Sequence, residues 1–302
     1  MSVTFAAIRV GEPIRHETLA VFPLFTEPGS KVDYLLSDEA IAAEAVIVKE
    51  VSESGSVPDL LVENKGDARV LFLEGEELVG AKQNRILNTS VLVAAHSTIK
   101  IPVSCVEHGR WRFRSKHFSS GGTHSSSKLL YCLKASVSRS VQAGGSHTSD
   151  QSAIWREVAR QQESLGASSG TGAMSDTYEA HRKRLDEFRE KVRYVEGASG
   201  VVVAVGRKVV ALDVFDKPTT CRKVWDRLMS GFVMDALESG ETEHQVEIGD
   251  VTRLLDGLGH FNWQPAQTVG EGEEYRAETA TGDHASALSF DGAVLHGSVV
   301  CQ

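Results

Sequence analysis

Carboxylate side chains gather close to amide and basic side chains in one stretch of the sequence, VLFLEGEELVGAKQNRILNTSVLVAAHSTIKIPVSCVEHGRWRFR, residues 70–114. Glu74 and Glu76 are two residues apart, on either side of Gly75. Two carboxylates beside a labile bond can serve as general acid and general base. If the strand runs unbroken, both acids point to one face and reach one ligand, with Glu77 on the other face. We predict Glu74 and Glu76 as catalytic residues; an exposed hairpin tip rich in Glu and Gly is the alternative.

Four side chains that can donate hydrogen bonds follow these acids in one run: Lys82, Gln83, Asn84 and Arg85. Arginine is the usual bidentate partner of phosphate or carboxylate, and the two amides can bind ribose hydroxyls or the edge of a base. We therefore predict that the run binds a ligand. The alternative is a polar loop in which Arg85 forms a structural salt bridge with Glu74 or Glu76.

A third group of reactive residues lies in the segment CVEHGRW, residues 105–111. Cys105 and His108 suggest a Cys–His nucleophile. Strand alternation puts Cys105 and Glu107 on one face and His108 on the other, so a buried, inert cysteine is the better interpretation. Glu107 and Arg110 are predicted ligand contacts.

Two further interpretations of this segment are weaker. A metal site would have to combine His96 with Cys105, Glu107 and His108, but their spacing fits no established ligand pattern, so we predict no metal site. Trp111 can either stack on a base or fill the core, and we interpret it as a core residue.

The common catalytic signatures do not occur. The sequence has no GxGxxG after a strand, no Walker lysine, no GxSxG and no HExxH. Common nucleotide-binding folds, serine hydrolases of the elbow type and zincins are therefore disfavoured. The residues identify no cofactor.

Charge is distributed unevenly along the chain. Its net charge is -9, which argues against binding of a nucleic-acid polymer or a membrane surface. No acidic residue lies between Glu107 and Asp150, whereas this interval holds seven Lys or Arg residues and four His residues. The rest of the chain carries 25 basic and 41 acidic residues. We predict a small anionic metabolite as partner; a solvated loop that binds nothing is the alternative, and the oligomeric state is left open.

Composition predicts a globular protein of the cytoplasm. The 302 residues include four scattered cysteines without a CxxC pair, which indicates reduced thiols. The most apolar run, residues 200–212, is broken by Gly206, Arg207 and Lys208 and is too short to span a membrane. The N-terminus shows no signal-peptide pattern.

The order of the expected elements predicts an α+β fold. Short strands with few helices fill residues 1–150 and indicate an antiparallel β-sandwich or a barrel-like lobe. Helical periodicity dominates residues 151–302: helices are expected at about 151–165, 176–195, 220–238 and 251–258, with a β-hairpin over 200–213 and closing strands at 275–279 and 293–300. The two parts are expected to pack as one integrated domain.

A basic insert rich in Ser and Gly interrupts this pattern at residues 115–127. Such segments bury little surface, so we expect residues 115–150 to be incompletely ordered. A strand pair over residues 128–141 is the one regular element expected within them.

The segments LEGEELVGAKQNRILNTSVLV and IPVSCVEHGRW resemble an uncharacterised microbial family, the ARG and rhodanese-phosphatase-superfamily-associated protein domains, named for neighbours that include ADP-ribosylglycohydrolases. VVALDVF and VWDRLMSGFVMDAL are similar too, so the likeness spans most of the chain, whereas residues 115–127 lie outside it. The resemblance implies a role near ADP-ribose or nucleotide-sugar metabolism. By position in the motifs it implies these site residues: Glu74, Glu76, Lys82, Gln83, Asn84, Arg85, Glu107, Gly109 and Arg110.

Two functions follow as expectations. The first is a hydrolase that cleaves a glycosidic or phosphate-bearing bond in an ADP-ribose-like or related nucleotide-sugar metabolite. The second is a non-catalytic module that binds such a ligand and reports it to a partner. The two functions differ in the role that they require of the acidic residues, because only the enzyme needs a carboxylate directed at the scissile bond.

Overall fold

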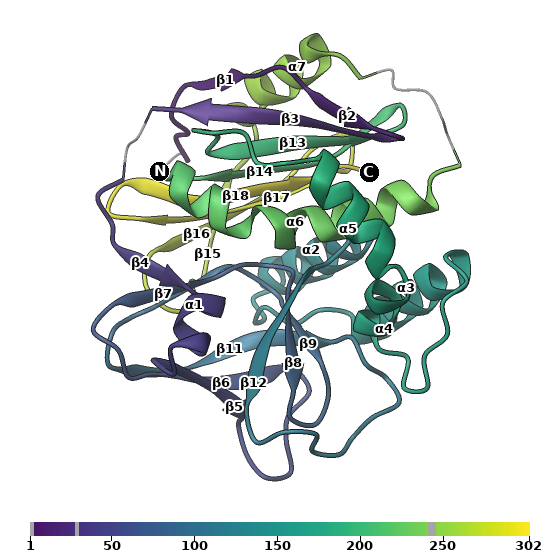
Figure 1. The fold of residues 1–302 in the computed structure, drawn as a ribbon. Coiled ribbons are helices and arrows are strands. Elements are labelled where there is room, and N and C mark those ends of the chain that lie inside the picture. Colours follow the sequence, from purple (N-terminus) through teal and green to yellow (C-terminus); the bar gives the residue numbers. More distant parts are fainter. Residues whose placement is uncertain (1–2, 28–29, 241–245) are drawn as a thin grey trace.

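The computed structural model describes residues 3–27, 30–240 and 246–302, which form an α+β fold (Figure 1). The described residues contain seven helices and eighteen strands. The α+β class and the barrel-like N-terminal lobe predicted from the sequence are confirmed. No helix among the described residues is long and apolar enough to cross a membrane.

Six antiparallel strands close into a barrel in the N-terminal half. In order around the barrel they are β11 (Ser97–Cys105), β6 (Asp59–Asn64), β5 (Val46–Glu50), β12 (Phe118–His124), β8 (Glu76–Gly80) and β9 (Arg85–Leu87). Apolar side chains such as Val48, Val62 and Val103 alternate along these strands and form the buried core of the barrel. A three-stranded sheet lies beside the barrel and consists of β4 (Tyr34–Leu36), β7 (Arg69–Phe72) and β10 (Val91–Val93).

A nine-stranded sheet forms the other half of the molecule. Its members are β1 (Ile8–Val10), β2 (Ile14–His16), β3 (Leu19–Thr26), β13 (Gly200–Val205), β14 (Lys208–Phe215), β15 (Gln264–Ala266), β16 (Glu273–Glu278), β17 (His284–Phe290) and β18 (Ala293–Val300). The expected hairpin over residues 200–213 is present as β13 and β14. β3 pairs with β13 along its length, so the first strands of the chain join a sheet built mainly by its second half.

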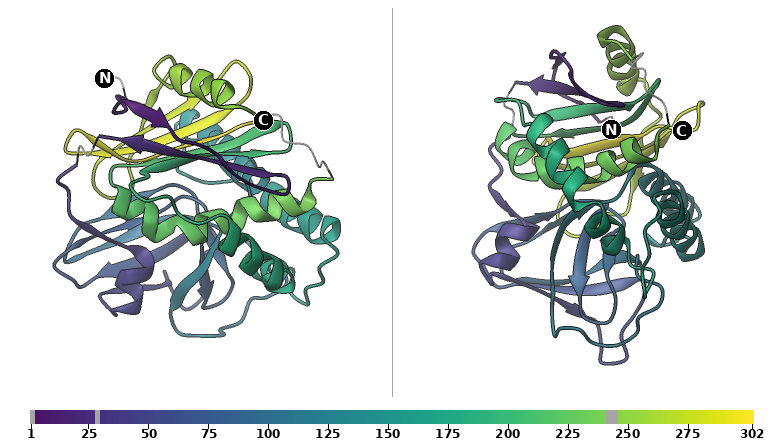
Figure 2. Two further views of the ribbon diagram at one scale, coloured as in Figure 1. Left: turned by 45° about the horizontal axis from the view of Figure 1, so that its top comes forward. Right: turned by 45° about the vertical axis from the view of Figure 1, so that its right-hand side comes forward.

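Helices cover both faces of this sheet and the side of the barrel (Figures 1 and 2). They are α1 (Ser37–Ala42), α2 (Ser127–Gln142), α3 (Gln151–Ser164), α4 (Met174–Ala180), α5 (Arg182–Lys191), α6 (Pro218–Glu238) and α7 (Ile248–Leu258). α6 lies between the sheet and the barrel and contributes Val224, Leu228 and Phe232 to the core on that side. α7 covers the opposite face through Val251 and Leu258.

The Ser/Gly-rich region is ordered, which corrects the expectation for residues 115–150. β12 pairs with β8 and β5, and the strand pair expected over residues 128–141 is instead the helix α2. Ser126 caps α2 by accepting a hydrogen bond from the Leu129 amide. Leu129, Leu133 and Val137 recur every four residues on its buried side. The region orders because this apolar stripe packs on α3 and α4, a contact that Ser and Gly content does not reveal.

The long helix expected over residues 176–195 is two helices. α4 ends and α5 begins at His181, whose φ of -107° and ψ of 16° depart from helical values. The His181 ring lies 2.9 Å from the Thr177 carbonyl oxygen, through Nδ1. The break lets α5 turn toward α6 while keeping Phe188 in the core.

Candidate functional site

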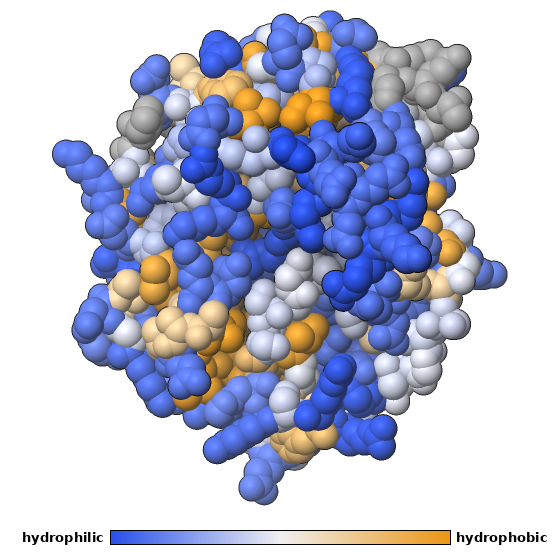
Figure 3. All heavy atoms as spheres, in the orientation of Figure 1, coloured by the Kyte–Doolittle hydropathy of each residue, from blue (hydrophilic) through white to orange (hydrophobic). Residues whose placement is uncertain are grey.

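Hydrophilic residues cover much of the face seen in Figure 3. The segment over residues 74–110 nevertheless buries many charged side chains. Its buried charged residues are Glu74, Glu76, Glu77, Lys82, Arg85, Glu107 and Arg110. Charged side chains are seldom fully buried without a partner, and shifted pKa values are common at functional sites. The segment is therefore the candidate site, and the partner of each charge decides its chemistry.

The strand breaks at the acids, so Glu74 and Glu76 do not share one face. β7 ends at Phe72 and β8 begins at Glu76, with Gly75 at a φ of +81° between them. Glycine adopts this left-handed conformation without a steric cost, which allows the turn. The two carboxylates consequently meet different parts of the molecule.

Glu74 is held in a buried ion pair with Lys134 of α2. The Lys134 ammonium donates to Oε2 of Glu74, and the Ser286 hydroxyl donates to the same oxygen at 2.6 Å. Arg276 of β16 lies 3.8 Å from the other oxygen. Burial alone would raise the pKa of Glu74, but Lys134 and Arg276 outweigh it and lower the pKa to about 2. Glu74 is therefore a permanent anion near neutral pH.

Glu76 lies next to Arg227 of α6 and Ser37 of α1. Its Oε2 accepts a hydrogen bond from the Ser37 hydroxyl at 3.0 Å and lies 3.3 Å from Nη2 of Arg227. Burial raises the pKa of Glu76 to about 7, although Arg227 and Ser37 act to lower it. Within the described residues, Oε1 of Glu76 and all three guanidinium nitrogens of Arg227 have no hydrogen-bond partner. A carboxyl group whose pKa is raised to about 7 thus faces a cation that is ion-paired with Glu76 and Asp38 but whose nitrogens make no hydrogen bond among the described residues.

Glu77 is the acid of this turn that accepts a hydrogen bond from the run of donors at residues 82–85. Its Oε1 accepts a hydrogen bond from the Asn84 amide at 3.3 Å, and its Oε2 accepts one from the Thr123 hydroxyl at 2.6 Å. Burial, with the nearby negative charge of Glu107, raises the pKa of Glu77 to about 7, against these two hydrogen bonds. The motif contained this residue, but alternation alone did not indicate a role for it.

The donor run lies at the end of the barrel and is partly satisfied by the protein itself. The Gln83 amide donates to the Glu107 carbonyl oxygen at 3.0 Å, and the Asn84 backbone N–H donates to the Glu107 carboxylate at 3.0 Å. Arg85 donates through Nη1 to the Gln83 side chain at 3.0 Å, while its Nε and Nη2 lack partners among the described residues. The alternative interpretation, a salt bridge from Arg85 to Glu74 or Glu76, is not formed among the described residues.

Glu107 and Arg110 form a bidentate pair with each other. Both contacts, Nε to Oε1 and Nη2 to Oε2, are 2.7 Å long. Arg110 also donates to the backbone oxygens of Gly80, Ala81 and Arg112. Burial would raise the pKa of Glu107, but the hydrogen bonds from Arg110 and Asn84 lower it. The Arg110 guanidinium is therefore a structural anchor whose donors are occupied.

The cysteine of the segment is buried. Burial raises the pKa of Cys105, whose thiol donates to the Gln83 side-chain oxygen at 3.2 Å. His96 hydrogen-bonds the Asp67 side chain at the surface. In the described part of the chain, the one group of three His, Cys or acidic side chains close enough to share a metal ion is His16, Glu17 and Glu187.

Several buried residues of the site come from parts of the chain where local patterns did not indicate a functional residue. Lys134 lies within residues 128–141, where a strand pair was expected, and Arg227 lies on the helix expected over residues 220–238. His296 of β18 links two polar residues: its Nδ1 lies 2.8 Å from the Ser90 hydroxyl, and its Nε2 lies 3.0 Å from the Asp213 carboxylate. In the sequence, the only sign of these contacts is that residues of opposite charge or with polar side chains occur on distant segments.

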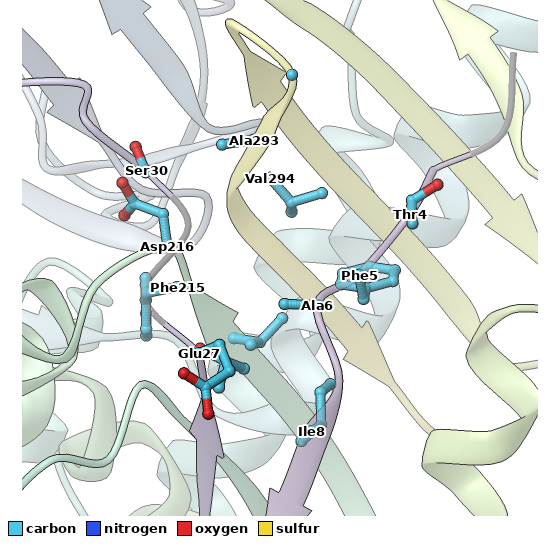
Figure 4. Close-up of a pocket in the computed structure, with 13 residues that line it drawn as sticks. Thr4, Phe5, Ala6, Ile8, Glu27, Ser30, Phe215, Asp216, Ala293 and Val294 are labelled. Carbon is cyan, nitrogen blue, oxygen red and sulfur yellow. The ribbon is translucent and has the colours of Figure 1, made fainter.

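A cavity of about 280 Å³ lies elsewhere, between the N-terminal segment, the end of β14 and the β17–β18 turn (Figure 4). Its walls include Phe5, Phe215 and Val294, and its lining also includes the polar residues Glu27, Ser30 and Asp216. None of the predicted site residues, all of which the structure describes, lines it. The buried acids are therefore packed against protein groups rather than around this hollow.

Comparison with known proteins gives one result. No curated protein and no solved structure matches the chain. A family model matches residues 7–300, nearly the whole sequence, and it includes both halves of the fold and every site residue discussed above. The chain belongs to the family of the ARG and Rhodanese-Phosphatase-superfamily-associated Protein domain.

Proposed function

We propose that the protein is a hydrolase acting on a small anionic metabolite of nucleotide type, such as an ADP-ribose-like compound. In this proposal Glu76 transfers the proton and Arg227 binds a phosphate or carboxylate group of the substrate. The observation that carries the proposal is that two neighbouring buried groups, Glu76 Oε1 and the Arg227 guanidinium, make no hydrogen bond among the described residues. Buried polar groups in folded proteins nearly always have partners, so groups without one are candidates for ligand contacts.

The different pKa values of Glu74 and Glu76 support different roles for these two acids. A general acid–base catalyst works best when its pKa lies near the working pH, and the pKa of Glu76 is raised to about 7. Glu74, with a pKa lowered to about 2, supplies a fixed negative charge that holds Lys134 in place. Two acids with separated pKa values are typical of sites that use one as an acid and the other as an anion.

The proposed reaction is hydrolysis of a glycosidic or phosphate-bearing bond. Water attacks the bond, one of its protons passes to ionised Glu76, and the departing oxygen receives a proton from the carboxyl group so formed. Arg227 offsets negative charge on the substrate, as guanidinium groups do for phosphates and carboxylates. Each turnover consumes one water molecule and returns Glu76 to its starting state.

The substrate would approach past α1. Glu76 and Arg227 are almost fully buried, whereas Asp38 next to them, which lies 3.4 Å from Arg227, is partly exposed at the rim. α1 has only six residues, and its Glu39 reaches α6 through a salt bridge with Lys223. In this proposal, displacement of this short helix exposes Glu76 and Arg227 to the substrate.

The test is turnover and binding measured on the same variants. Purified protein is assayed against ADP-ribose, NAD, nucleoside diphosphates and sugar phosphates, with ligand-induced melting as the binding readout. With a substrate identified, Glu76→Gln should lose about 10²- to 10⁴-fold in rate while binding survives. Arg227→Lys should weaken binding, because lysine offers no planar bidentate fork. The matched control is Glu39→Gln, an acid on the rim of the same site.

Full activity in Glu76→Gln would reject the catalytic role of this residue. The assay then passes to Glu74→Gln and Glu77→Gln, the other acids of the turn. No turnover with any compound of the panel, together with ligand-induced stabilisation, would favour the second candidate function.

The second candidate is a non-catalytic module that binds such a ligand at the barrel end. The observation that favours it is the free donor pair of Arg85, Nε and Nη2, in the run formed with Lys82, Gln83 and Asn84. Arg85→Lys should then weaken ligand binding by about tenfold, since hydrogen bonds to charged groups contribute roughly 1.5–3 kcal/mol. Arg110→Lys is the comparison, because the Arg110 donors are already used by Glu107 and backbone oxygens. Equal affinity in both variants and the parent protein would reject Arg85 as a ligand contact.

A further inference from the structure

Two large aromatic side chains are exposed next to the barrel end. Trp111 is 48% exposed and Phe113 is 54% exposed, and they are the large hydrophobic residues exposed to this degree among the described residues. The expectation that Trp111 fills the core is therefore wrong. Its position just after the anchored Arg110 directs it outward. Neighbouring exposed aromatic side chains are costly to leave in water and often mark a binding surface.

Buried cations hold the inner sides of both rings. The Lys82 ammonium lies 5.3 Å from the centre of the Trp111 ring and 5.0 Å from the centre of the Phe113 ring. The Arg85 guanidinium carbon lies 5.8 Å from the Trp111 ring centre. Cation–π attraction of this kind fixes the orientation of the rings while their other surfaces remain open to solvent.

The loop that carries the rings is anchored at several points. Arg110 donates to the Ala81 carbonyl oxygen at 2.6 Å and to the Arg112 carbonyl oxygen at 3.0 Å. The Arg114 backbone N–H donates to the Ala81 carbonyl oxygen at 2.9 Å. A rigid loop loses little conformational freedom when a ligand binds, so less of the interaction energy is consumed by ordering.

Positive charge surrounds the rings. Arg112, Arg114 and Lys116 are exposed in the same loop, within the interval that has no acidic residue. The rest of the chain is strongly acidic, which disfavours a long polyanion but tolerates a small one. Flat apolar surfaces combined with nearby cations are complementary to a molecule that has both an aromatic ring and phosphate groups.

We infer that Trp111 and Phe113 form a platform that stacks the base of a nucleotide, while Arg112 and Arg114 bind its phosphates. The inference rests on the proposed nucleotide-type ligand, but it does not depend on hydrolysis. It identifies the base as a recognised part of the ligand. A sugar phosphate without a base would then lack the stacking contribution and bind less tightly.

The test is calorimetric titration of the full-length chain with ADP, adenosine and ribose 5-phosphate. ADP should bind more tightly than either fragment, because it alone offers base and phosphates together. Trp111→Ala should weaken ADP binding about fivefold to 100-fold, the range expected for loss of one stacked base, and Trp111→Phe should retain most of the affinity. Arg112→Ala should weaken ADP but not adenosine. Arg193→Ala, an exposed arginine outside the loop, is the matched control.

Three outcomes would overturn the platform. They are equal ADP affinity in Trp111→Ala and the parent chain, equal affinity for ADP and ribose 5-phosphate, and binding to single-stranded DNA or anionic phosphatidylserine vesicles without binding to ADP. Melting temperature identifies a misfolded variant, and Trp111→Leu, which keeps apolar bulk but removes the aromatic face, then replaces Trp111→Ala as the test. The proposed hydrolase fails separately, when ADP-type ligands bind at Trp111 but Glu76→Gln leaves turnover unchanged.

Discussion

Nη2 of Arg227 lies 3.3 Å from Oε2 of Glu76, yet no nitrogen of that guanidinium makes a hydrogen bond within the described residues. The contact brings α6 to the first residue of β8, at the junction of the barrel and the nine-stranded sheet. Burial prevails over the neighbouring cation in setting the Glu76 pKa. A cation with unused donors beside a carboxyl group that titrates near neutral pH is the feature on which the proposed chemistry depends.

The raised pKa of Glu76 predicts a dependence of stability on pH. Its pKa rises from the ordinary 4.5 to about 7 in the folded protein, so between these values the folded state keeps a proton that the unfolded chain releases. Stability therefore falls as pH rises from about 4.5 to 7, by about 3 kcal/mol for this residue alone. Glu76→Gln removes that loss, so its melting temperature relative to the parent should increase between pH 5 and pH 8.

Two comparisons make the pH prediction specific. Glu77 and Asp235 also have pKa values raised to about 7, so the parent and Glu76→Gln both retain some loss of stability with rising pH. Glu190→Gln, at an exposed position of α5, should follow the parent at every pH. A constant difference between Glu76→Gln and the parent from pH 5 to pH 8 would contradict the raised pKa.

The Glu74–Lys134 ion pair predicts a strong coupling between two distant segments. Substitution of either residue alone would leave the other as a buried charge without its partner, which lowers the free energy of unfolding by about 3–5 kcal/mol. Glu74→Gln and Lys134→Met should each lower the urea midpoint markedly, and the double variant should recover a large part of the loss. Strictly additive effects, within about 0.5 kcal/mol, would show that the two residues do not interact in solution.

The surroundings and backbone conformation of Gly75 predict that a side chain at this position is destabilising. A Cβ atom there would lie 2.5 Å from Cδ2 of Leu130 and 2.9 Å from Cε1 of His124, and the φ of +81° adds backbone strain. Gly75→Ala should therefore destabilise the protein by about 2–4 kcal/mol in urea unfolding.

Gly122→Ala is the matched control for Gly75→Ala. Gly122 also has a positive φ, +68°, but a Cβ atom there meets nothing within 4 Å, so only the strain of about 1–2 kcal/mol is expected. Equal losses in the two variants would mean that Leu130 and His124 move aside without cost. The close contacts at Gly75 would then not contribute to the stability of the turn between Glu74 and Glu76.

Local patterns in the sequence were sufficient for the fold class and for much of the secondary structure. Two apolar runs joined by a turn near Gly206 predicted the hairpin of β13 and β14, and helical spacing after Pro218 predicted α6. These predictions succeed because strand and helix periodicity are properties of neighbouring residues. The same reasoning located the candidate site on residues 74–110, since charges between apolar strands predict buried polar groups.

The tertiary structure decided which residues act together, because partners and burial depend on contacts between distant segments. Glu74 meets Lys134 and Arg276, and Glu76 meets Arg227, across 60 to more than 200 residues of sequence. α2 was not recognised because its stripe of leucines has meaning only against α3 and α4. The direction of each pKa shift follows from the same packing, as two glutamates two residues apart acquire pKa values of about 2 and about 7. The sequence alone determined that these acids are present, and the packing of sheet, barrel and α6 around Gly75 determined what each can do.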